Sequence, residues 1–136
     1  MAPDVTLVTL KDWLSSMFQE KGLTPQVEAH DDSLGFFLRL NDGTDGRVIL
    51  VDSEDGYFAM TCLNAFETMF PVDELSWMKA AATHDLVGAV TQYNGMTACM
   101  VAQTVRPQSL NELRADLGRF VTRIGLTAEA FRTATA

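Results

Sequence analysis

Cysteine and proline are scarce in this chain, which has two cysteines and four prolines in 136 residues. A small secreted domain stapled by disulfides needs several cysteines, and a zinc site needs Cys or His pairs a few residues apart. Cys62 and Cys99 fall inside expected strands and form no such pair. We therefore expect two reduced core thiols in a cytoplasmic protein, with a disulfide between them as the alternative.

Positive charge is also scarce, with 10 Lys and Arg against 18 Asp and Glu and a net charge of −8. A protein that binds nucleic acid needs a basic stripe, and the basic residues here are scattered. No apolar run approaches the ~20 residues that span a bilayer. The start, Met1–Asp4, lacks the basic residues and apolar stretch of a secretory signal. We expect no nucleic acid partner, no membrane partner and a cytoplasmic location.

Catalytic signatures are missing as well, since the chain has no GxSxG motif and no Gly-rich phosphate loop. His30 and His84 each precede an aspartate, but a general base needs a nucleophile or a substrate pocket to act on. The acidic segment 41–52 matches a calcium-binding loop cleanly only at Asp45 and Gly46. We therefore expect no enzyme activity, no bound metal and no cofactor.

The hydrophobic periodicity, in contrast, is informative, because it changes between the helical and the strand period several times. Helices are expected at 7–21, 75–82 and 110–124, a short edge strand at 26–30, and strands at 34–40, 47–51, 57–63, 86–93 and 96–105. Without the short edge strand the order is α-β-β-β-α-β-β-α. It predicts an α+β fold with a twisted antiparallel sheet and helices packed on one face. One domain covers 1–136, with an ordered core of about 6–125.

Capping and turn residues mark several element ends. Asn94-Gly95 favours the type I′ turn of a hairpin, and Asp73 suits the N-cap of the middle helix. Ser109–Glu112 is a capping box that opens the last helix, and Gly125 fits its end. The tail 126–136 then either adds one turn or frays. The apolar side of the middle helix is predicted to consist of Val72, Leu75, Met78 and Ala82.

Two central strands carry apolar residues on both sides. In one of them, Val48 and Leu50 alternate with Ile49 and Val51. A sheet with one face in water shows a cleaner alternation of apolar and polar residues. Either helices cover both faces, or the second face meets another subunit or an apolar ligand.

The element order, the length and the acidity together resemble the type III secretion chaperone-like fold. That fold includes the class I secretion chaperones and the YbjN-like sensory-transduction regulators. The resemblance spans 7–124 and contains no diagnostic motif. The Asn94-Gly95 hairpin, followed by Ser109–Glu112 and an amphipathic helix, is the part most similar to the YbjN-like members. The resemblance implies a homodimer.

In the class I chaperones, the first helix and the sheet present apolar patches to an extended segment of a secreted protein. The resemblance therefore implies a non-catalytic cytoplasmic domain, chaperone-like or regulatory, that binds a segment of an unknown protein or peptide partner. The expected partner-facing residues are Trp13, Met17, Phe37, Ile49 and Val51. The alternative is a small-molecule-binding or enzymatic domain with a pocket between the sheet and the helices.

Overall fold

The computed structural model describes residues 7–20, 27–30, 32–39, 45–53, 55–65, 73–93 and 96–135. The helices are α1 (Leu7–Glu20), α2 (Glu74–Thr83) and α3 (Leu110–Thr135). The strands are β1 (Val27–Ala29), β2 (Ser33–Arg39), β3 (Asp45–Asp52), β4 (Phe58–Ala65), β5 (Val87–Tyr93) and β6 (Met96–Val105). The predicted α+β class and the predicted element order are confirmed, including the short strand β1.

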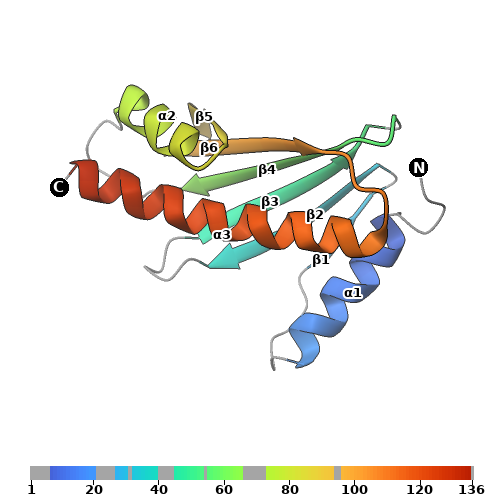
Figure 1. The fold of residues 1–136 in the computed structure, drawn as a ribbon. Coiled ribbons are helices and arrows are strands. Elements are labelled where there is room, and N and C mark those ends of the chain that lie inside the picture. The colour runs from blue at the N-terminus through green and yellow to red at the C-terminus, as the bar shows by residue number, and fades with distance from the viewer. Residues whose placement is uncertain are drawn as a thin grey trace.

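The six strands form one antiparallel sheet in the order β1-β2-β3-β4-β6-β5 (Figure 1). Strands β2 to β4 form the predicted meander, and β1 lies at one edge as expected. The β5–β6 pair joins the meander through β6, so that β5 becomes the second edge. The predicted turn residues of this pair, Asn94-Gly95, lie outside the described residues.

All three helices lie on the same face of the sheet. Helix α3 runs along the sheet, α2 lies over the end that holds β5 and β6, and α1 lies beside β1 (Figure 1). The strands contribute buried apolar residues at every second position, and these meet buried residues of the helices. This core includes Leu34, Phe36, Val48, Leu50, Phe58, Met60, Cys62, Cys99 and Val101 from the strands, and Leu10, Leu14, Trp77, Leu113, Phe120 and Ile124 from the helices. In the described part of the chain, the alternative that helices cover both faces is wrong.

Helix α2 begins where the sequence predicts but packs on another side. The Asp73 carboxylate caps it, since Oδ1 accepts from the Leu75 N–H at 3.2 Å and Oδ2 accepts from the Ser76 hydroxyl at 2.8 Å. These hydrogen bonds, that of the Ser76 hydroxyl first, lower the pKa of Asp73. The predicted apolar side is wrong, because Leu75 and Met78 remain 59% and 44% exposed.

The side of α2 that packs on the sheet contains one large and two small residues, Trp77, Ala80 and Ala81. A Cβ added at Gly88 of β5 would lie 2.8 Å from the Ala81 Cβ and 3.3 Å from the Met78 Cα. The helix therefore sits so close to β5 that only glycine fits beneath it. The Trp77 indole Nε1–H donates to the Met100 carbonyl of β6 at 3.0 Å, which satisfies its polar group inside the core.

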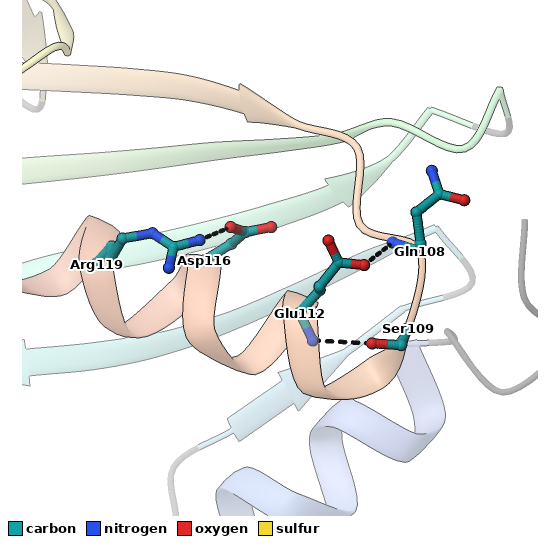
Figure 2. Close-up of polar contacts among 5 residues, drawn as sticks. All are labelled: Gln108, Ser109, Glu112, Asp116 and Arg119. Atoms are coloured by element: carbon teal, nitrogen blue, oxygen red, sulfur yellow. Dashed lines mark hydrogen bonds and ion pairs between the residues drawn. The ribbon is translucent and has the colours of Figure 1, made fainter.

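Helix α3 opens with the predicted capping box (Figure 2). The Ser109 hydroxyl accepts from the Glu112 N–H at 3.1 Å, and the Glu112 carboxylate accepts from the Gln108 N–H at 2.7 Å. The glutamate thus reaches the backbone one residue before the cap itself. One turn later, Asp116 and Arg119 form an ion pair along the exposed side of the helix (Figure 2).

The predicted end of α3 at Gly125 is wrong, because the helix continues to Thr135. The added turns bury Thr127, Ala128 and Phe131. The Phe131 ring meets the Trp77 ring edge to face, with 5.4 Å between the ring centroids. This burial against α2 outweighs the weak helix propensity of Gly125, so the segment from 126 to 135 is part of the folded core.

Candidate functional site

The face of the sheet that points away from the helices, here called the open face, is an apolar surface that spans five strands. Cross-strand register fixes its members, because alternate residues of paired strands share a face. Its first row is Phe37, Arg47, Leu63, Met100 and Ala89. Its second row is Gly35, Ile49, Thr61, Ala102 and Val87, and its third row includes Val51 and Ala59.

Several of these apolar side chains are in contact with water. Phe37 is 54% exposed and Val87 is 72% exposed, and Val51 is exposed as well. Between them Ile49, Leu63 and Met100 are half-buried. Single exposed apolar residues are ordinary on protein surfaces, but a contiguous set across several strands is typical of an interaction surface.

One ion pair lies beside the described apolar rows of the open face. The Arg47 guanidinium lies 3.5 Å from the Glu28 carboxylate and 5.9 Å from the centroid of the Phe37 ring. It lies beside Gly35, where an added Cβ would be 4.0 Å from Arg47 Nη2. Both charged side chains are well exposed, so the pair stabilises the fold little. Its effect is to neutralise one corner of the apolar surface.

The structure brings three of the five expected partner-facing residues together. Phe37, Ile49 and Val51 lie on the open face. Trp13 and Met17 lie on α1, in the helix layer, where they pack half-buried against the core. The Arg114 guanidinium covers the Trp13 ring at 5.1 Å from the ring centroid. These two residues are therefore not part of the open face.

Sequence reasoning missed the contribution of β5 and β6 to this surface, namely Ala89, Met100 and Val87. The alternation inside 86–93 and 96–105 was visible in the sequence. The missing information was the pairing of β4 with β6, which extends the apolar rows of the meander across the hairpin.

Of the candidate chemical groups of the sequence, the two cysteines lie in the core and His84 lies at a helix end. Cys62 and Cys99 are buried thiols in the core, as expected, and burial raises the pKa of each thiol to about 12. Both are therefore protonated at neutral pH. His84 closes α2, with its N–H donating to the Ala81 carbonyl at 3.0 Å. His30 is exposed, and its neighbour Asp31 lies outside the described residues.

Across the ranges that the structure describes, no three His, Cys, Asp or Glu residues group closely enough to hold a metal ion. None of the helices in these ranges is long and apolar enough to cross a membrane. Comparisons with protein-family models, with curated proteins and with solved structures find no match to this chain. The open face is therefore the feature from which a function is inferred.

Proposed function

We propose that the chain is a non-catalytic, cytoplasmic protein-binding domain that acts as a homodimer and binds a segment of a partner protein on its open face. The observation that supports this proposal is the contiguous apolar surface of Phe37, Ile49, Val51, Leu63 and Met100 on the side of the sheet opposite the helices. A bound segment with apolar side chains would remove this surface from water.

The dimensions of the open face suit an extended segment. Five strands at ~4.8 Å spacing, each with about six residues in register, give a surface on the order of 24 by 20 Å. A peptide of roughly six residues in extended conformation crosses that length. Its apolar side chains would contact the rows at alternate positions, which favours a partner with alternating apolar residues.

The other side of the sheet offers little support for the small-molecule alternative. Large side chains fill the space between sheet and helices, and Trp77, Phe58, Phe120 and Met60 are fully buried there. This space is core, packed by residues from both layers.

The proposal is tested with substitutions on the open face. Phe37→Asp and Ile49→Asp each place a charge on the open face, and Val8→Asp places one on an apolar site of α1 outside this face, where Val8 is 68% exposed. Partners are captured from the native host on the wild-type chain, and the bound segment is mapped by proteolysis and synthesised. Its affinity for each variant is measured by fluorescence anisotropy.

We expect each open-face substitution to weaken binding of that segment at least about tenfold, because a charge must be desolvated to form the complex. The Val8→Asp variant keeps the wild-type affinity. If the two open-face variants are folded and bind the segment as tightly as the wild type, the proposal is wrong.

A further inference from the structure

Two pairs of an arginine and an aromatic residue lie on the open face, each pair across two neighbouring strands. Phe37 of β2 and Arg47 of β3 are register partners, and the guanidinium carbon lies 5.9 Å from the centroid of the ring. One residue beyond the last pair of β4 and β6, the same register places Arg106 opposite Tyr57. There the guanidinium carbon lies 5.0 Å from the centroid of the tyrosine ring. Cation–π contact thus holds both arginines against the sheet.

The two pairs mark opposite ends of the apolar rows. The pair of Phe37 and Arg47 belongs to the first row, together with Leu63 of β4. Tyr57 precedes Leu63 by six residues, which is about 20 Å along an extended strand. The end of β6 and the turn from β3 to β4 lie together at that far end of the sheet (Figure 1). A segment that runs along the strands over the open face therefore meets one arginine at each end.

The two ends differ in charge. The Arg47 guanidinium already has a carboxylate beside it, that of Glu28 at 3.5 Å. Arg106 is exposed, and among the described residues no carboxylate lies within ion-pair distance of it, not even that of Asp55 in the adjacent turn. No described oxygen accepts a hydrogen bond from Arg106 either. One end of the open face is thus neutral, and the other presents the donors of a guanidinium.

The turn beside Arg106 is held in a fixed conformation. The N–H and the hydroxyl of Ser53 both donate to the Tyr57 carbonyl, at 3.1 and 2.7 Å. Gly56 has a φ of 84°, which favours glycine, and an added Cβ would lie 3.8 Å from the Arg106 Nε. The glycine therefore leaves that side of the guanidinium without a covering side chain. A fixed turn and an uncovered guanidinium lower the cost of ordering this end of the face when a ligand binds.

We propose that Arg106 binds a side-chain carboxylate of the partner segment, from an Asp or Glu that stands at one end of its alternating apolar residues. This inference rests on the proposed function, because it names the chemistry of the segment that the open face binds. A guanidinium binds a carboxylate through two parallel N–H···O hydrogen bonds, which fix position as well as add affinity. The segment then extends from Arg106 along the apolar rows toward Phe37, over about six residues.

The charge of the rest of the molecule limits the segment to one such acidic residue. The chain has a net charge of −8, so it repels an anionic segment except close to Arg106. At physiological salt, attraction between exposed charges is screened beyond about 8 Å. At the other end of the rows, Glu28 already neutralises Arg47, so a second acidic residue there gains no partner. The ligand class is therefore an apolar extended segment with a single acidic end.

The test uses a library of random peptides, so that no natural partner is needed. Peptides of about nine residues are displayed on phage as internal segments in multiple copies, which retains weak binders. They are selected on the wild type, on Arg106→Gln, on Phe37→Asp and on Lys79→Gln. Lys79 is exposed on α2, outside the open face, so its variant is the matched control for the loss of one positive charge. Circular dichroism confirms that each variant is folded.

We expect the wild type and Lys79→Gln to select alternating apolar residues with an Asp or Glu at one end. Arg106→Gln should select the apolar alternation without the acidic residue. The most enriched peptide is then synthesised with its acidic residue and with the corresponding amide, and the affinity is measured by fluorescence anisotropy. Arg106→Gln and the amide peptide should each raise the dissociation constant about tenfold, and the two changes together should raise it no further.

The failure of this inference is distinguishable from failure of the proposed function. If Arg106→Gln selects the same acidic residue, or if the two tenfold losses multiply, the carboxylate does not bind Arg106. The inference is then wrong, and the proposed function stands. If the wild type selects no peptide whose binding Phe37→Asp removes, the open face binds no such segment, and both are wrong.

Discussion

Gly88 is the residue on which the position of α2 depends. An added methyl group would meet the Ala81 Cβ at 2.8 Å, and neither residue has a flexible side chain that can move away. We expect Gly88→Ala to lower the free energy of unfolding by about 1–3 kcal/mol through overpacking.

The control for this substitution is Gly118→Ala in α3, where an added Cβ has no heavy atom within 4 Å. There the better helix propensity of alanine raises stability by about 0.5–1 kcal/mol. Urea denaturation of both variants measures the two effects. Equal effects of the two substitutions would contradict a tight contact between α2 and β5.

Burial of the two thiols gives a pH-dependent prediction. The pKa of Cys62 and of Cys99 rises to about 12 from the ordinary thiol value of 9.0, because the thiolate would lose its water. Because the pKa of the thiol is higher in the folded chain than in the unfolded chain, the protonated thiol favours the folded state. Its contribution to the free energy of unfolding is complete below about pH 9 and is lost as the pH rises toward about 12. At pH 8 the unfolded chain therefore reacts with a thiol reagent and the folded chain does not.

The rate of reaction with a disulfide reagent, measured across a urea series, checks this. The rate should follow the unfolded fraction seen by circular dichroism. Fast reaction of either thiol in the absence of urea would show that the cysteine is accessible in the folded protein.

At the scale of elements, the end of α3 contributes stability that the sequence does not predict. Phe131 is buried and packs edge to face on Trp77, six residues beyond the glycine at which the sequence predicts the end of the helix. We expect Phe131→Ala to lower the free energy of unfolding by about 3–4 kcal/mol. Leu126→Ala, at an exposed site of the same helix, should change it by less than about 0.5 kcal/mol. Denaturant titrations of the two variants make the comparison.

The sequence predicted those elements whose signals are local. Ser109 and Glu112 give the start of α3 through their own hydrogen bonds, and Asp73 gives the start of α2 in the same way. The end of α3 depends on Trp77, more than fifty residues earlier in the chain, so Gly125 misled the prediction. The packed side of α2 depends on Gly88, which has no side chain to appear in a periodicity.

The candidate site, too, was predicted where the sequence signal is local and missed where it depends on a long-range contact. Alternation within β2 and β3 was enough to place Phe37, Ile49 and Val51 on one face. Met100 and Ala89 join them only through the pairing of β4 with β6, a long-range contact that no local pattern encodes. Trp13 and Met17 lie on the same helical stripe as core residues and are half-buried against the core. The spacing of apolar residues along the helix does not distinguish such a position from one that faces a partner.

At the scale of the whole molecule, net charge opposes self-association. Each copy carries a net charge of −8, so the two copies of the proposed homodimer repel each other. Added salt screens the repulsion between the two copies. We therefore expect the dissociation constant of the dimer to fall as sodium chloride is raised from low to physiological concentration. A dimer that weakens with salt would indicate an interface held by charge pairs.

The place of β6 between β4 and β5 has a consequence for synthesis on the ribosome. β4 is a central strand in the finished sheet, but its partner β6 is completed about 40 residues later in the chain. Until then, β4 is the edge of a growing meander, and its sequence FAMTCLNA contains no charge. At synthesis rates of about 5–20 residues per second, this neutral edge is unpaired for roughly 2–8 s. The nascent chain is thus most vulnerable to misassociation in its middle, at a strand that is paired on both sides in the folded protein.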